Sequence, residues 1–177
     1  MALAPFNLKK WVDENRHKLK PPVGNDQLWK EDHPEFIVMV VGGPNSRKDF
    51  HVDAGEELFY QVEGEITVRI VEDGNIRNVK IGEGDIFLLP SNVPHSPQRG
   101  ANTVGLVVER KRTSDEPDGF QWYCENCGNK IHEVFLHVTD ITTQLKPVFD
   151  AFWSDIQART CDRCGTVMEP PAPPPTA

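Results

Sequence analysis

Apolar residues recur along this chain in short runs separated by turn residues, rather than in long helical stripes. Alternating or continuous apolar runs of this length are typical of β-strands. Glu72-Asp73-Gly74-Asn75 predicts a hairpin turn, and Gly82-Glu83-Gly84-Asp85 predicts another turn. The segments expected as strands are FIVMVVGG (36–43), LFYQV (58–62), EITVRIV (65–71), NVKI (78–81), IFLLP (86–90) and TVGLVVER (103–110). Short strands at such regular spacing indicate a β-sandwich or barrel.

The pattern changes at both ends of this β-region. Residues 3–20 have a helical apolar period that stops at Pro21-Pro22, while residues 111–119 are polar and read as a linker. The proline-rich end cannot form a hydrogen-bond ladder and is expected to be disordered. The organisation expected is therefore an N-terminal helix and covering segment (1–30), a β-barrel (31–112), a small cysteine-bearing unit (113–168) and a tail (169–177).

Composition and charge narrow the function classes. The formal charge of −8 argues against a nucleic-acid-binding protein, because phosphate binding needs a basic surface. No apolar run is long enough to cross a bilayer, and the N-terminus lacks a signal-peptide core. A cytoplasmic protein with no membrane partner is expected.

Two stretches bring metal-ligating residues into the β-region. In a strand, residues two apart share a face, so His51 and Asp53 are expected to point the same way, as are Glu57 and Phe59 on the next strand. His95 follows a later buried strand, on a loop stiffened by prolines. Two histidines and one carboxylate match the facial triad of non-haem Fe(II) oxygenases, which leaves one face of the ion open. Isolated histidines and glutamates on strands are more often structural. Asp53 could in principle replace Glu57, but two histidines and Glu57 suffice, so Asp53 is not expected to be a ligand.

Two arginines and a glutamate indicate a substrate class. Arg47 precedes the first candidate histidine and Arg99 follows the second, each by four residues. A planar guanidinium suits a carboxylate, so the two favour a small carboxylate-bearing molecule, although a lone surface arginine is usually only solvated. Glu109 ends an apolar strand, where a carboxylate facing a cavity accepts a proton or hydrogen bond from a ligand.

The four cysteines form two CxxCG units. Each unit lets two thiolates reach one ion, and the glycine accommodates a positive φ. Four thiolates suit either Zn(II) or a rubredoxin-like iron, and the sequence does not separate the two. The expected ligands of this second metal are Cys124, Cys127, Cys161 and Cys164.

The order H-x-D-x3-E-x6-G followed by G-x5-P-x4-H resembles the two motifs of the cupin superfamily, whose fold is a double-stranded β-helix or jelly-roll barrel. Several further stretches resemble the 3-hydroxyanthranilate 3,4-dioxygenase family, in its microbial form with a rubredoxin-like C-terminal unit. They are LKPPVGN (19–25), VVGGPNSRKDFH (40–51), EELFYQVEG (56–64), GDIFLLPSNVPHSPQR (84–99), VVER (107–110) and the two CxxC units.

This resemblance implies a ring-opening dioxygenase that uses Fe(II) and O2 to convert 3-hydroxyanthranilate into 2-amino-3-carboxymuconate semialdehyde. That product is the precursor of quinolinate, on the route from tryptophan to NAD through the kynurenine pathway. The family also implies a homodimer. The residue roles that it implies are His51, Glu57 and His95 as iron ligands, Arg47, Arg99 and Glu109 around the substrate, and Asn25, Val23, Phe59 and Pro97 lining the pocket.

Two other functions are compatible with the residues themselves. The barrel site would also suit another metal-dependent cupin that acts on an aromatic carboxylate. A cupin that binds a ligand without turning it over is the third possibility, and it would bind metal tightly but show no reaction.

Overall fold

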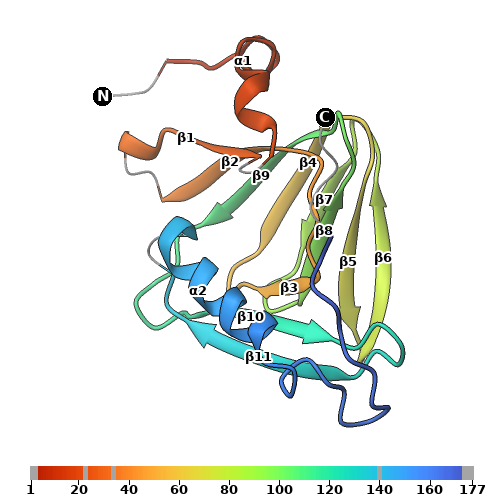
Figure 1. Ribbon diagram of the computed structural model, residues 1–177. Coiled ribbons are helices and arrows are strands. Elements are labelled where there is room, and N and C mark those ends of the chain that lie inside the picture. The colour runs from red at the N-terminus through yellow and green to blue at the C-terminus, as the bar shows by residue number, and fades with distance from the viewer. Residues whose placement is uncertain (1–3, 22–23, 33–34, 139–140, 173–177) are drawn as a thin grey trace.

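The computed structural model describes residues 4–21, 24–32, 35–138 and 141–172. Two antiparallel sheets face each other and form the predicted barrel (Figure 1). The five-stranded sheet has the order β1 (Asn25–Leu28), β2 (Phe36–Gly42), β9 (Val104–Arg110), β4 (Glu57–Glu63) and β7 (Ile86–Leu89). The six-stranded sheet has the order β11 (Lys130–Leu136), β10 (Asp118–Tyr123), β3 (Asp49–Val52), β8 (His95–Arg99), β5 (Ile66–Glu72) and β6 (Asn75–Ile81).

The core between the sheets follows the alternation seen in the sequence. Along β4, Glu57, Phe59 and Gln61 are buried while the residues between them are only partly so, as the pattern predicted. Phe59 and Val107 of one sheet pack in a single cluster with Ile66, Val68 and Ile70 of the other. The cupin fold is therefore confirmed, because both sheets bury one face against the other. The predicted hairpin joins β5 to β6, with positive φ at Asp73 and Gly74.

The N-terminal helix is shorter than its apolar period suggested. α1 (Leu8–Asn15) is followed by the short 3₁₀ helices η1 (Arg16–Leu19) and, after β1, η2 (Lys30–Asp32). The Asn7 side chain caps α1 by accepting a 2.9 Å hydrogen bond from the Lys10 amide. Leu19 packs so closely on β2 that a Cβ at Gly42 would lie 2.1 Å from the Leu19 carbonyl oxygen. Gly42 thus allows the N-terminal segment to pack directly on β2.

The C-terminal part adds to the barrel rather than standing beside it. β10 pairs with both β3 and β11, so the six-stranded sheet continues past residue 112. The helix α2 (Ile141–Ser154) lies against this extension, where Phe152 stacks on Trp122 with ring centroids 4.3 Å apart (Figure 1). The sequence did not predict α2, because Pro147 interrupts its pattern. Among the residues described, no helix is long and apolar enough to span a membrane.

Candidate metal centres and substrate site

The three residues predicted to hold the barrel metal converge between the two sheets. His51 on β3 and His95 on β8 are direct cross-strand partners, and Glu57 begins β4 on the opposite sheet. The Glu57 Oε1 atom lies 3.0 Å from His95 Nε2 and 3.3 Å from His51 Nδ1. One nitrogen or oxygen from each residue lies within 4.8 Å of the others. His95 occupies the first position of β8, whereas the sequence had placed it on a loop.

A divalent cation fits this arrangement. The Oε1 atom of Glu57 is buried and has no hydrogen-bond partner among the described residues, although two imidazole nitrogens face it. A buried carboxylate oxygen left without a partner is costly unless a cation completes it. The residues that would hold the ion are His51, Glu57 and His95, and their chemistry suits a first-row transition metal with open positions.

Hydrogen bonds behind the two histidines fix which nitrogen faces the site. His95 Nδ1 donates to the Val93 carbonyl over 3.1 Å, which leaves Nε2 to face Glu57. His51 Nε2 lies 2.7 Å from the Asp118 carboxylate, to which it donates, and Nδ1 is left toward Glu57. Such partners set the tautomer and ring orientation of histidine ligands.

Beyond the ligands lies a group of buried charges. Glu109 on β9 is the cross-strand partner of Glu57, and Asp53 and Glu109 each place an oxygen within 4.8 Å of a Glu57 oxygen. The Arg112 guanidinium compensates these acids, at 3.1 Å from both Glu109 and Asp53. Asp53, which was not expected to be a ligand, is thus paired with an arginine.

The burial of these acids changes their titration. Burial, reinforced by the negative charge of Glu57, raises the pKa of Glu109 to about 7, against the opposing effect of Arg112. Burial also opposes ionisation of Glu57, but the two histidines that face its carboxylate outweigh burial and lower the pKa of Glu57. Glu57 is therefore ionised and available to a cation, while Glu109 can exchange a proton near neutral pH.

Arg99 is a buried cation without a full set of partners. It ends β8, on the same strand face as His95 and Pro97, and its Nη1 atom has no hydrogen bond within the part of the chain that the structure describes. A Cβ at Gly105 would lie 2.8 Å from this Nη1, so the glycine makes room for the guanidinium over β9. An unpartnered buried guanidinium is suited to an anionic ligand.

The side chain of Arg47 is in a different environment from that of Arg99. It is only partly buried, and its guanidinium already pairs with Asp49, with Nη2 at 2.5 Å from Oδ2 and Nε at 3.3 Å from Oδ1. A substrate role for Arg47 would require this pair to open, so that role stays a prediction.

The residues predicted to line the substrate pocket differ in their burial and in whether the structure describes them. Phe59 is buried, with its ring centroid 6.1 Å from that of the metal-ligand candidate His95, and Pro97 is buried on β8. Asn25 is exposed at the start of β1. Val23 lies outside the described residues. The pocket roles of these residues stay predictions.

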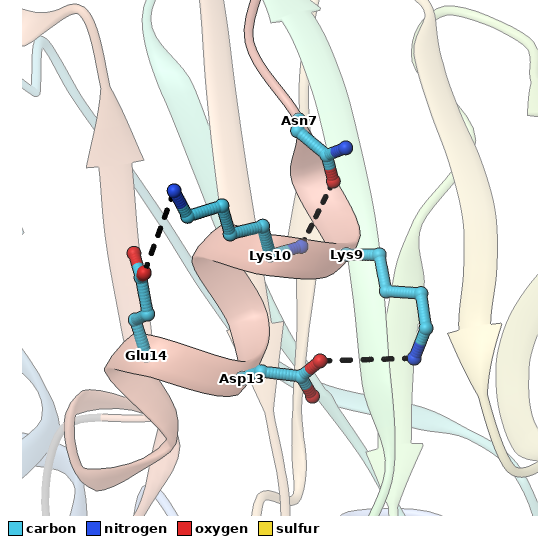
Figure 2. Close-up of a pocket in the computed structure, with 5 residues that line it drawn as sticks. All are labelled: Asn7, Lys9, Lys10, Asp13 and Glu14. Carbon is cyan, nitrogen blue, oxygen red and sulfur yellow. Dashed lines mark hydrogen bonds and ion pairs between the residues drawn. The ribbon is translucent and has the colours of Figure 1, made fainter.

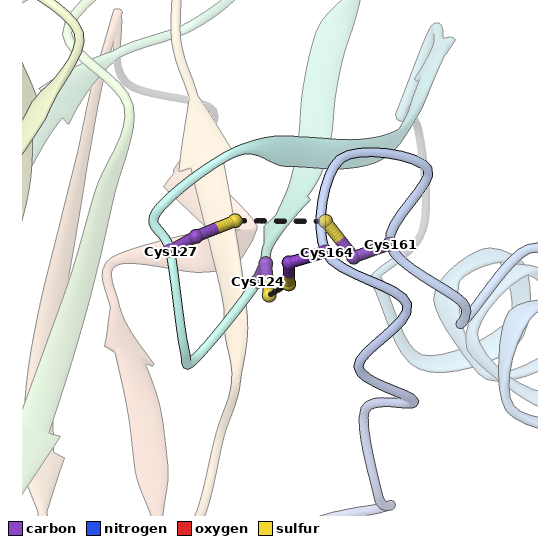
Figure 3. Close-up of side chains that lie close together, drawn as sticks. All are labelled: Cys124, Cys127, Cys161 and Cys164. Carbon is purple, nitrogen blue, oxygen red and sulfur yellow. Dashed lines mark hydrogen bonds between the residues drawn. The ribbon is translucent and has the colours of Figure 1, made fainter.

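The four cysteines form a second centre. Two loops bring the side chains together, one after β10 and one near the C-terminus (Figure 3). Sγ atoms are 3.5 Å apart for Cys124 and Cys164 and 3.6 Å for Cys127 and Cys161, and all four are free thiols. A tetrahedral ion with bonds of about 2.3 Å separates its sulfurs by about 3.8 Å, whereas a disulfide needs about 2.05 Å. The arrangement therefore fits a metal.

Backbone geometry supports that reading of the cysteine pairs. Gly128 and Gly165 have φ of +71° and +73°, as predicted for the glycine after each pair. The Gly128 amide donates to the Cys124 carbonyl over 2.9 Å, and the Gly165 amide donates to the Cys161 carbonyl over 2.8 Å. Each CxxCG unit is thus a tight turn that presents two sulfurs to one point.

A surface hollow on α1 lies apart from both centres. Its lining side chains are paired with one another, Lys9 with Asp13 at 3.7 Å and Lys10 with Glu14 at 3.9 Å (Figure 2). All of these side chains are well exposed, so the hollow has the character of a solvated helix surface.

Two site residues were missed at the level of sequence. Arg112 and Asp118 were assigned to the polar linker, yet Asp118 is buried beside His51 and Arg112, largely shielded from solvent, contacts Glu109. Polar residues near a proline and a glycine usually form exposed loops, so nothing in the local pattern distinguishes these two.

Comparison with known proteins agrees with this geometry. The family model described as 3-hydroxyanthranilic acid dioxygenase matches residues 1–153. A 3-hydroxyanthranilate 3,4-dioxygenase of Xanthomonas campestris is 49% identical, with 98% of this chain and 96% of that protein covered. Proteins of the same name from Neurospora crassa and Bacillus thuringiensis are 47% and 48% identical, covering 96% and 94% of this chain and 92% and 93% of theirs. The chain belongs to the 3-hydroxyanthranilic acid dioxygenase family.

Proposed function

We propose that this protein converts 3-hydroxyanthranilate and O2 into 2-amino-3-carboxymuconate semialdehyde, as an Fe(II)-dependent ring-opening dioxygenase. The observation that carries the proposal is the buried triad of His51, Glu57 and His95, with an unpartnered Glu57 oxygen, in a member of this family. Family membership favours Fe(II) as the ion, and its product would feed the synthesis of quinolinate and pyridine nucleotides.

When bound, the iron supplies the redox chemistry by which O2 reacts with the aromatic ring. His51, Glu57 and His95 would hold the ion, and a set of two histidines and one carboxylate leaves coordination positions open to substrate and O2. The protein's own contribution is then to position the substrate and to control charge around it.

Arg99 is the residue best suited to hold the substrate carboxylate. Its guanidinium is buried, and its Nη1 atom lacks a partner, so a carboxylate would restore its missing hydrogen bond. Arg47 would add a second contact after release from Asp49. The two arginines together favour an aromatic acid over an uncharged phenol.

Glu109 is suited to take a proton from the substrate hydroxyl or to accept a hydrogen bond from its amino group. It faces Glu57 across β4 and β9, next to the metal ligands. Phe59 and Pro97 would exclude water on the apolar side of the ring.

The test compares 3-hydroxyanthranilate with 2-aminophenol, which has the same chelating pair without the carboxylate. With iron-loaded protein under air, we expect kcat/KM to be at least ~100-fold higher for the acid, because two charge-assisted hydrogen bonds contribute about 3 kcal/mol. Equal values for both substrates would contradict carboxylate recognition, and turnover of neither would contradict the proposed reaction.

The second centre we assign to a structural role, with Fe or Zn held by the four thiolates. It joins the loop after β10 to the segment that follows α2 (Figure 3), and it shares no residue with the barrel triad. Free paired cysteines also favour a reducing compartment, so we place the protein in the cytoplasm.

We also infer a homodimer. The edge strand β7 exposes Ile86 and Leu88, at 68% and 52% of their surfaces, and β2 exposes Phe36 at 56%. All three are on the five-stranded sheet, whose open edge favours pairing with another copy. Light scattering should give twice the mass of one chain, and Leu88→Asp should shift it toward the monomer; a monomeric wild-type protein would contradict this.

A further inference from the structure

Arg112 contacts three buried carboxylates at once. Its Nε and Nη2 atoms lie 3.0 and 2.8 Å from Oδ1 of Asp118, and Nη1 lies 3.1 Å from Oε1 of Glu109. Nη2 also lies 3.1 Å from Oδ2 of Asp53. The side chain is 12% exposed and each carboxylate 5% or less, so solvent does little to screen these pairs.

We propose that Arg112 is a positioning residue for the reaction: its guanidinium fixes Glu109 and, through Asp118, the ring of the metal ligand His51. Among the described residues, the carboxylates that Arg112 contacts are Asp53, Glu109 and Asp118, and none of them belongs to the triad of His51, Glu57 and His95. Arg112 would therefore act through the residues that it holds.

The path to the metal runs through a single oxygen. Asp118 Oδ1 accepts from Arg112 Nε over 3.0 Å and from His51 Nε2 over 2.7 Å. Because His51 donates through Nε2, its Nδ1 atom stays unprotonated toward Glu57 and the ion. If Asp118 turned away, the ring would lose the contact that sets both its tautomer and its tilt.

The path to Glu109 uses the other side of the guanidinium. Nη2 donates to Glu109 Oε2 over 3.1 Å, while Nη1 lies 3.1 Å from Oε1. Two contacts to two different oxygens restrict the plane of a carboxylate, which one contact does not. The plane of Glu109 decides which of its oxygens is presented to the substrate.

A planar fork is required for these contacts, and charge alone is not sufficient. Lysine carries the same charge on a single nitrogen and cannot contact Asp118 and Glu109 with two separate donors in one plane. The neighbouring Arg110 offers a matched comparison, because it pairs with Glu116 on the surface and its side chain is 40% exposed.

Whether substitution of Arg112 raises or lowers metal affinity distinguishes a positioning role from a role in charge compensation. If Arg112 only balanced the acids, removing its charge in Arg112→Gln would strengthen binding of a divalent cation. If it positions His51, the same change weakens binding. Arg112→Lys keeps the positive charge and removes only the planar set of guanidinium donors. Any loss of metal affinity in this variant is therefore due to lost positioning.

Mn(II) is the probe, because its preference for oxygen and nitrogen ligands directs it to the barrel rather than to the thiolates. Titration followed by electron paramagnetic resonance gives its dissociation constant and the spectrum of the bound ion. We expect the constant to rise at least ~10-fold in Arg112→Lys and in Arg112→Gln, with an altered bound-state spectrum. Arg110→Lys should match the wild type within twofold.

Kinetics with iron-loaded protein give a second, independent readout, and this arm rests on the proposed function. Arg112→Lys should lower kcat at least ~10-fold with KM changed less than threefold, because the residue does not touch the substrate carboxylate. An inactive wild type would overturn the proposed reaction, while the Mn(II) arm would still decide the role of Arg112.

The proposal is overturned if Arg112→Lys binds Mn(II) within twofold of the wild type, or if Arg112→Gln binds it more tightly. Should Arg112→Gln fail to fold, Arg112→Lys and Asp118→Asn carry the test. Asp118→Asn keeps the shape of the side chain but weakens the link to His51, so it should also raise the Mn(II) dissociation constant; an unchanged constant there would remove the path through Asp118.

Discussion

Replacing Arg99 by methionine should make the protein more stable and a poorer enzyme. Burial, with the positive charge of Arg47 adding to it, lowers the pKa of Arg99 to about 10. Against its usual value of 12.5, this corresponds to about 3 kcal/mol of destabilisation of the charged guanidinium at neutral pH. Methionine fills a similar space without a charge, so we expect the free energy of unfolding to rise by about 1–3 kcal/mol.

The same change removes the proposed carboxylate partner. Losing two charge-assisted hydrogen bonds costs about 3 kcal/mol of substrate binding, which is a ~100-fold rise in KM. Stability is measured by urea unfolding followed by tryptophan fluorescence, with both proteins loaded with the same metals, and KM by initial rates on 3-hydroxyanthranilate.

Arg47→Met serves as the control for this prediction. Arg47 is partly exposed and paired with Asp49, so its loss should not stabilise the protein. The reasoning is refuted if Arg99→Met lowers stability, or if its KM stays within threefold of the wild type. If Arg99 is a buried charge that binds the substrate carboxylate, its removal must both raise the free energy of unfolding and raise KM.

Three further changes test separate parts of the structure. His51→Ala should abolish metal binding in the barrel but leave the thiolate-bound metal, as metal analysis would show; loss of both would contradict separate centres. Cys161→Ser should release the second metal and lower Tm by several degrees with kcat within threefold of the wild type, and a large loss of turnover would give that centre a catalytic role. Gly105→Ala should raise KM about 5–10-fold, because the new Cβ would lie 2.8 Å from Arg99 Nη1; an unchanged KM would show that the guanidinium can move without cost.

The barrel strands and the candidate metal ligands could be predicted because each has a local signature. Alternation on β4 placed Glu57 and Phe59 on the buried face, and the structure confirms it. The paired cysteines and their trailing glycines likewise act within five residues of chain, so short-range geometry is sufficient.

The parts that were missed depend on contacts between distant segments. α2 contains a proline and is stabilised by packing on Trp122, which no local pattern reveals. Asp118 is buried because β10 pairs with β3 and brings it against His51, far away in the sequence. Whether a charged residue in a polar segment is buried is decided by such tertiary contacts.

The most direct test of the central claim is oxygen uptake by protein reconstituted anaerobically with Fe(II) and then given 3-hydroxyanthranilate and air. We predict prompt uptake with the near-ultraviolet absorbance of a muconic semialdehyde, one O2 per substrate. Glu57→Ala should abolish it, while Glu56→Ala, a change at an exposed neighbour, should leave it intact. No uptake with iron bound in the barrel, or equal uptake in the Glu57 variant, would contradict the account.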